Sequence, residues 1–278
     1  GILFGAGASV NVGGLVASTL AISDADFMAN NYKFSGAGAG SVLNQGTINA
    51  ADGGYVALLG ANVSNQGVIA AQLGAIALAA GEAVTLDMAG DKLLNVTVDQ
   101  GALNALVDNG GMIRADGGQV LLTTQAAGSL LANVVNNTGV IQAQTLVTGE
   151  NGTIRLLGGT QSGTLNVAGT LDASAPTGGN GGAIETSAAR VNIASGVILT
   201  TAAPSGTTGT WLISPQDFTV GSLSTDNISG PTLSAQLVTN SVTISTAAAG
   251  GGDIHVNNAI AWTASSTPTT LSLLADGN

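Results

Sequence analysis

The segment Asn44-Gln-Gly-Thr-Ile-Asn-Ala50 recurs as Asn65-Gln-Gly-Val-Ile-Ala-Ala71, and this repeat decides the fold. Each copy is followed by a short apolar run, Gly53-Gly-Tyr-Val-Ala-Leu58 after the first and Gly74-Ala-Ile-Ala-Leu78 after the second. Repeats of about 20 to 50 residues are typical of solenoids, in which each unit packs only against its neighbours. The repeat therefore predicts a stack of similar coils.

Further copies of the motif lie downstream. Their spans are Asn109–Ala115, Asn137–Ala143 and, more weakly, Gly169–Ala173 and Gly196–Thr200. The marker glycines stand at positions 46, 67, 111, 139, 169 and 196, at intervals of 21, 44, 28, 30 and 27. We interpret the interval of 44 as two coils of about 22 residues.

Apolar and polar residues alternate within each copy, as in Val56 and Leu58, which is the period of a half-buried strand. A unit of two or three short strands cannot bury its own apolar face, so the copies must stack on one shared core. We predict an all-β chain folded as a right-handed parallel β-helix. We expect residues 1–220 to form its main part and residues 221–278 to add further, more degenerate coils.

One corner of each coil is expected to carry asparagine and glycine. We predict that Asn44, Asn65, Asn109 and Asn137 stack as a hydrogen-bonded structural ladder. The residues two positions further on are the predicted turn glycines, assigned because glycine tolerates a left-handed backbone: Gly46, Gly67, Gly111 and Gly139.

One segment breaks the repeat. Ala83–Asp87 and Leu94–Asp99 are alternating runs joined through Met88-Ala-Gly, which predicts a β-hairpin outside the β-helix. We expect a short helix over residues 99–107, capped by Asp99.

Composition excludes several classes of function. The net charge is −11 with five basic residues, too few to neutralise nucleic-acid phosphates. There is no cysteine, so disulfides, thiolate metal sites and thiol catalysis are all absent. The apolar stretches are also too short for a membrane-spanning helix.

No motif for catalysis, cofactor binding or metal binding is found, and we expect no enzyme, no cofactor and no metal. The single histidine, His255, lies in an alternating run where it should face solvent. Asp52, Asp116 and Asp172 each follow the same strand of their repeat, so they could line up along one edge. A carbohydrate-active β-helix enzyme is the alternative that such a line of carboxylates keeps open, although turn residues facing water explain it more simply.

Several segments together resemble the filamentous haemagglutinin family of two-partner secretion exoproteins. The segments are Gly1–Gly5, Val10–Ser23, Val42–Ala50, Gly169–Ala175, Ile184–Ser187 and Gly209–Phe218. The resemblance implies a β-helical secretion domain that an outer-membrane transporter partner exports unfolded from a Gram-negative bacterium. The family's Asn-Pro-Asn-Gly turn and upstream cap have no counterpart here beyond Gly1, so we expect the chain to be a slice of a longer protein.

The resemblance also implies a function. Mature proteins of this family are large secreted fibres that adhere to cells, sugars or each other, in virulence or biofilm. We therefore expect a segment of a secreted or surface adhesin with a host-cell, glycan or matrix receptor. A self-assembling matrix filament, joined end to end, is the alternative. Other family members acquire haem or carry toxins, in regions mostly beyond such a segment.

Overall fold

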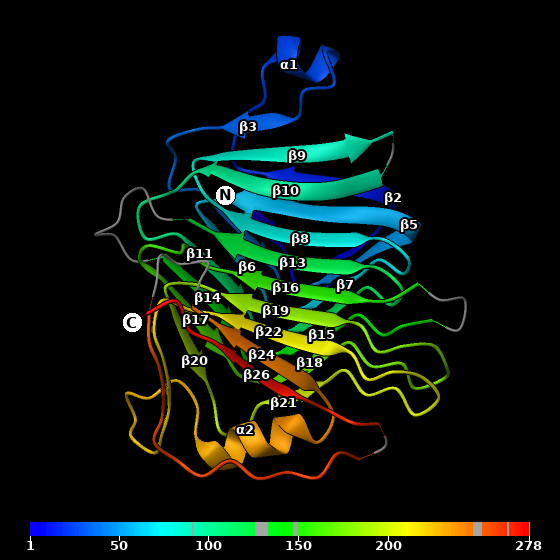
Figure 1. Cartoon of the computed structure of the whole chain (residues 1–278). Coiled ribbons are helices and arrows are strands. Elements are labelled where there is room, and N and C mark those ends of the chain that lie inside the picture. The colour runs from blue at the N-terminus through cyan, green and yellow to red at the C-terminus, as the bar shows by residue number, and fades with distance from the viewer. Residues whose placement is uncertain (91, 126–132, 147–149, 247–251, 266, 278) are drawn as a thin grey trace.

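The computed structural model describes residues 1–90, 92–125, 133–146, 150–246, 252–265 and 267–277. The chain winds into stacked parallel coils that run from the N-terminal coils at the top of Figure 1 to the C-terminal coils at the bottom. The predicted all-β fold, a parallel β-helix with a β-hairpin outside it, is confirmed.

One face of the β-helix, here called face A, is a seven-stranded parallel sheet. Its strands, in the order in which they pair, are β1 (Ile2–Phe4), β4 (Ser41–Asn44), β6 (Asn62–Asn65), β11 (Leu106–Asn109), β14 (Asn133–Asn137), β17 (Gly163–Val167) and β20 (Arg190–Ile193).

The other two faces of the β-helix are two rows of strands that belong to a single sheet, because β2 (Ser9–Ser18) and β5 (Thr47–Gly60) are long enough to run through both rows. The short row continues as β7 (Val68–Ala70), β12 (Met112–Arg114), β15 (Val140–Gln142), β18 (Thr170–Asp172) and β21 (Ile198–Thr200). The long row continues as β8 (Ala75–Ala80), β13 (Gln119–Thr124), β16 (Thr153–Leu157), β19 (Ala183–Ser187), β22 (Thr210–Ser214), β24 (Ser241–Ser245) and β26 (Leu271–Leu274).

The interior of the coils is filled by aligned apolar side chains. In the short row, Ile48, Ile69, Ile113 and Ile141 occupy successive rungs in register, and all four are fully buried. Each such side chain stabilises the fold by about 1.5–3 kcal/mol on removal from water. Since side chains alternate across a strand, the same register places the intervening residues outside.

The hairpin lies outside the β-helix, against the first coils of the long row. Its strands β9 (Ala83–Ala89) and β10 (Lys92–Gln100) pair antiparallel, and β3 (Lys33–Ser35) joins β9 to make a three-stranded sheet. Helix α1 (Asp24–Met28) precedes β3 and projects beyond this sheet (Figure 1). A second hydrophobic core fills the space between the hairpin and outward-facing residues such as Ala57, Leu59 and Ala77.

Two sequence-based expectations in this region are wrong. The interval of 44 residues is one coil and not two, because β6 pairs directly with β11 and the additional residues form the hairpin. Residues 99–107 contain no helix: Asp99 and Gln100 end β10, and Leu106 begins β11. Val98 and Gln100 pair with β9 on either side of Asp99, which keeps this segment in the strand and overrides the capping propensity of Asp99.

Side chains cover the last strand of the short row. Helix α2 (Gly230–Leu237) packs against β21, and Gln236 Oε1 accepts a hydrogen bond from Leu199 N at 3.2 Å. Asn240 Oδ1 accepts from Thr201 N at 2.7 Å, and its Nδ2 donates to Leu199 O at 3.1 Å. The side-chain amides of Gln236 and Asn240 thus form the hydrogen bonds that the backbone of a further strand would form with β21. Beyond them the long row continues into β24 and β26, and β23 (Phe218–Val220) pairs with β25 (Ile254–Val256).

No helix among the described residues is both long and apolar enough to span a membrane.

Candidate functional site

The four asparagines singled out by the repeat lie in one continuous column. Each Nδ2 donates to the Oδ1 of the next coil at 2.8 Å, from Asn44 to Asn65, from Asn65 to Asn109 and from Asn109 to Asn137. All four side chains have 0% exposure. The column ends where Asn137 Nδ2 donates to Ala168 O at 2.8 Å.

Asn44, Asn65 and Asn137 also hydrogen-bond to the glycine of their own corner. Asn44 Oδ1 accepts a hydrogen bond from Gly46 N at 3.1 Å, which closes the turn between face A and the short row. A buried amide is costly unless both its ends are bonded, and the column satisfies this condition in every coil. The ladder therefore links the geometry of one corner to that of the next.

The glycines at this corner are required for a reason that differs from the predicted one. A Cβ on Gly67 would lie 2.1 Å from Gly46 O, and one on Gly111 would lie 2.2 Å from Gly67 O. Gly46, Gly67, Gly111 and Gly139 are not among the glycines with positive φ, so the expected left-handed turn is wrong for them. Consecutive coils approach so closely here that backbone lies on backbone, and no side chain fits between them.

A second amide ladder, on the outside of face A, was not predicted. Asn166 Nδ2 donates to Asn136 Oδ1, and Asn192 Nδ2 donates to Asn166 Oδ1, each at 2.8 Å. These residues lie outside the Asn-x-Gly motif. The signal that could have found them is an asparagine next to an inward-facing position near the end of the last three strands of face A, as in Asn136-Asn137 and Asn166-Val167.

The three aspartates considered for catalysis do not form one line. Asp172 pairs in register with Gln142, and Gln142 pairs in register with Arg114 of the coil before it. The position that matches Asp172 is therefore Arg114, which precedes Asp116 by two residues. Asp52 is exposed. The expected alignment is therefore wrong, since the strand register offsets Asp172 from Asp116.

Asp116 and Asp172 instead belong to a network of amides at this corner. Asp116 is 7% exposed and contacts Arg114 Nε at 3.0 Å and Gln142 Nε2 at 2.9 Å. Gln144 Nε2 donates to Asp172 Oδ2 at 2.7 Å. These bonds tie neighbouring coils together, as expected of a structural network of carboxylates and amides.

The remaining residues of chemical interest lie apart from one another. His255 lies on β25 and is exposed, and Trp211 is fully buried with its Nε1 donating to Thr186 Oγ1 at 3.0 Å. Within the described part of the chain, no three His, Asp or Glu side chains gather where they could hold a metal ion.

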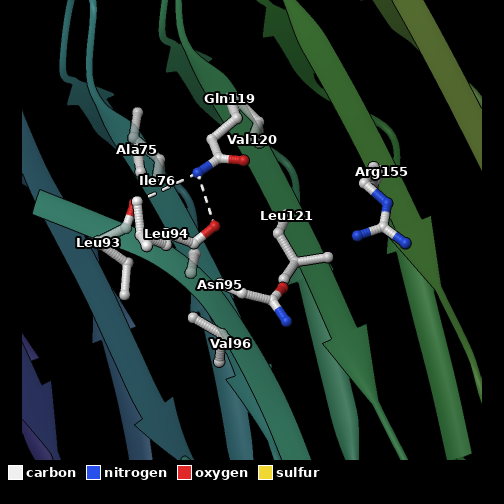
Figure 2. A pocket seen from close by; sticks show the side chains of 11 residues that line it. Ala75, Ile76, Leu93, Leu94, Asn95, Val96, Gln119, Val120, Leu121 and Arg155 are labelled. Carbon is white, nitrogen blue, oxygen red and sulfur yellow. Dashed lines mark hydrogen bonds between the residues drawn. The ribbon is translucent and has the colours of Figure 1, made fainter. Parts of the chain in front are cut away.

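The surface hollows near the hairpin follow the outer side of β10. One, shown in Figure 2, lies between Leu93–Val96 of the hairpin and Gln119–Leu121 of β13, with Arg155 beyond them. A larger hollow of about 350 Å³ adjoins it along Asn95–Val98.

Comparison with known proteins agrees with the fold. The chain is similar to the crystal structure of the HMW1 secretion domain from Haemophilus influenzae, with a TM-score of 0.62 and 21% identity. The superposition covers 98% of this chain and 77% of that chain. A comparison with curated proteins finds no match.

The family model described as TPS secretion domain, where TPS denotes two-partner secretion, matches residues 1–185. Such domains serve transport, and their exoproteins cross the outer membrane with the help of a dedicated transporter. Since the match covers most of the 278 residues, this chain belongs to the TPS secretion domain family of two-partner secretion exoproteins.

Proposed function

We propose that this chain is the secretion segment of a large surface adhesin, and that it folds coil by coil as it leaves its outer-membrane transporter. The main observation in support is that each coil makes its close backbone contacts and its buried hydrogen bonds with the coil before it. Gly111 fits only against the carbonyl of Gly67, and Asn109 receives its hydrogen bond from Asn65. A coil formed outside the cell thus templates its successor and opposes backward sliding.

The absence of cysteine supports export in an unfolded state. An oxidising compartment would close disulfide loops in a chain that carried cysteines, and such loops could not be threaded through a barrel. The parallel pairing also supports folding during export, because each strand pairs with the strand of the adjacent coil, as β6 does with β11.

A disulfide introduced between coils tests this proposal. Ser64 and Asp108 are neighbours on β6 and β11, with the Ser64 hydroxyl 3.5 Å from Asp108 Oδ2, so Ser64→Cys with Asp108→Cys closes a loop across one coil. We expect the oxidised full-length exoprotein to stall in the periplasm and the reduced one to be secreted. Each single-cysteine variant is the control. Normal secretion of the oxidised double variant would contradict threading of an unfolded chain.

The adhesin part of the proposal rests on the resemblance to filamentous haemagglutinins and on a fold that lengthens by adding coils. We further propose that the chain has no catalytic activity, since the carboxylates of its surface network are bonded to amides and to Arg114. We include in this proposal a host receptor and end-to-end association in a biofilm matrix.

The test of adhesion compares two bacterial strains, one that displays the full exoprotein and one that lacks the transporter gene. The measured quantity is the number of bacteria that adhere to cultured cells. Equal adhesion by both strains would contradict an adhesive role.

A further inference from the structure

Among the described residues, one side of β10 is a free sheet edge. The extra-helical sheet has the order β10–β9–β3, so no described strand pairs with the other side of β10. Leu86 N donates to Tyr32 O at 3.0 Å, which shows that the backbone polar groups of Leu86 face β3. Val96 lies opposite Leu86, and polar groups alternate in direction along antiparallel strands. The N–H and C=O of Val96 therefore point away from β9, and no described residue bonds to them.

This edge borders a continuous groove. The hollow of about 350 Å³ has Val96–Val98 on one wall and Thr123 and Leu157 of the β-helix on the other. A hollow of about 260 Å³ continues it past Leu93, Leu94 and Gln119. The floor is the outer surface of β13 and β16, as Figure 2 shows for Leu121 and Arg155.

One side chain already hydrogen-bonds to β10 from within this groove, between the two larger hollows. Gln119 Nε2 donates to Leu93 O at 3.3 Å and to Leu94 O at 3.1 Å (Figure 2). The carbonyl groups of this edge thus accept hydrogen bonds from the groove side. A further strand would lie about 4.8 Å from β10, in the hollow whose far wall includes Leu157.

The basic side chains that line the groove favour an acidic binding partner. Arg155 lines two of the hollows along β10 and Lys92 lines a third, and no described Asp or Glu lines these three. Asp52 lies near Lys92 in the hollow that adjoins the third. Arg155 Nε contacts Glu185 at 2.8 Å, and its two terminal nitrogens have no hydrogen bond to a described residue. A carboxylate is the natural partner for these remaining donors.

We propose that the free edge of β10 binds an extended, acidic segment of a second polypeptide as an added strand, with a carboxylate at Arg155. The backbone of Val96 provides the strand pairing, and Leu157, half-buried at the rim of the second core, receives an apolar side chain of the segment. This surface is separate from the ladder and corners on which the export proposal rests, so either proposal can fail alone.

A peptide titration of the purified chain tests the proposal. The probe is the acetylated and amidated peptide Ala-Val-Thr-Leu-Asp-Met-Ala, the sequence of β9, because this strand already pairs with β10. We expect NMR shifts at the amides of Val96 and Val98. Replacing the aspartate of the peptide by asparagine should weaken binding about two- to fivefold, the size of an exposed ion pair.

Two variants make the test specific. Val96→Pro removes the N–H that faces the groove and keeps the bonds of Asn95 and Thr97 with β9, so it should weaken binding about fivefold or more. Arg155→Gln should abolish the preference for the acidic peptide and leave the Val96 shifts in place. An unchanged thermal unfolding midpoint verifies the fold of each variant.

Several results would overturn the proposal. They are shifts confined to other surfaces, no shifts at all, equal binding by Val96→Pro, and an acidic preference that survives Arg155→Gln. Shifts of the same amides by cellohexaose would instead assign the groove to a glycan. A dimer in sedimentation that Val96→Pro dissociates would assign it to a second copy of this chain.

Discussion

At the scale of single residues, two columns at one corner hold the coils together. The buried asparagines supply hydrogen bonds between coils, and the glycines beside them allow the backbones to touch. Both residue types were predictable from the repeat. The reason for the glycines was not, because contact with the coil before is a property of the stack and cannot be read from one turn.

Asn109 is the first residue to test. Asn109→Ala leaves Asn65 Nδ2 without its Oδ1 acceptor and Asn137 Oδ1 without its donor, both in the interior. We expect a loss of about 2–4 kcal/mol in the free energy of unfolding, measured in urea. The matched control is Asn166→Ala in the outer ladder, where water replaces the lost partners and the loss should stay below about 1 kcal/mol. Equal losses in the two variants would show that burial does not set the strength of the ladder.

Gly111 tests the close approach of coils. Gly111→Ala places a methyl group 2.2 Å from the carbonyl oxygen of Gly67, so the coils must separate. We expect a loss of about 2 kcal/mol or more in the same measurement. Gly196→Ala, whose new methyl group meets nothing within 4 Å, should change stability by less than about 0.5 kcal/mol. A stable Gly111→Ala protein would refute the steric explanation.

Asp26 at the start of α1 gives a prediction for pH. Hydrogen bonds from Ser23 and then Asn31, helped by Lys33 and opposed by slight desolvation, hold the pKa of Asp26 below its ordinary value. Its contribution is therefore present above the ordinary pKa of an aspartate and is lost as the pH falls through the lowered one. We expect NMR titration of the Asp26 carboxyl to give a midpoint below the ordinary pKa of an aspartate, and Ser23→Ala to raise it. A midpoint for Asp26 at or above the ordinary pKa of an aspartate would contradict this.

At the scale of elements, the hairpin and α2 complete surfaces that the β-helix leaves open. The hairpin buries outward-facing apolar residues of the long row, and α2 covers the edge of the short row. The sequence contained a signal for the first: Ala75–Ala80 is a continuous small apolar run, typical of a strand buried on both faces. The sequence contained no signal for the role of α2. Gln236 and Asn240 match the spacing of the backbone groups of Leu199 and Thr201 only in the folded structure, and this match has no counterpart in the sequence pattern.

The strand-like role of α2 can be measured. Gln236→Ala with Asn240→Ala removes the acceptors for Leu199 N and Thr201 N and the donor to Leu199 O. We expect the amides of β21 to lose hydrogen-exchange protection by about tenfold or more, as for buried groups left unpaired. Ser229→Ala, which only removes the N-cap of α2, should leave these amides more protected than the double variant does. Unchanged protection in the double variant would mean that these amides do not cover the edge.

At the scale of the whole molecule, each coil contacts only its neighbours, so stability should be distributed locally. The predicted repeat and alternation were sufficient to identify the architecture, since both recur in coil after coil. The number of coils was harder to derive, because the hairpin doubles one interval and imitates a missing repeat between Asn65 and Asn109.

Local distribution of stability leads to a test with one core residue. Ile113→Ala opens a cavity in one coil, which costs about 2–5 kcal/mol. We expect hydrogen exchange to rise most in β7, β12 and β15, which share that part of the core, and much less in β22 and β24. An equal rise in all strands, measured by mass spectrometry, would show that the coils unfold as one unit.

The position of the hairpin has a consequence for sequence change. Between Ala80 and Leu106 the chain leaves the β-helix, yet β11 returns to the register that β6 requires. Residues added at this corner lengthen the polypeptide and leave the rise per coil untouched. A hairpin of different length would therefore leave the coils above and below in register, provided that its apolar face still packs on the second core.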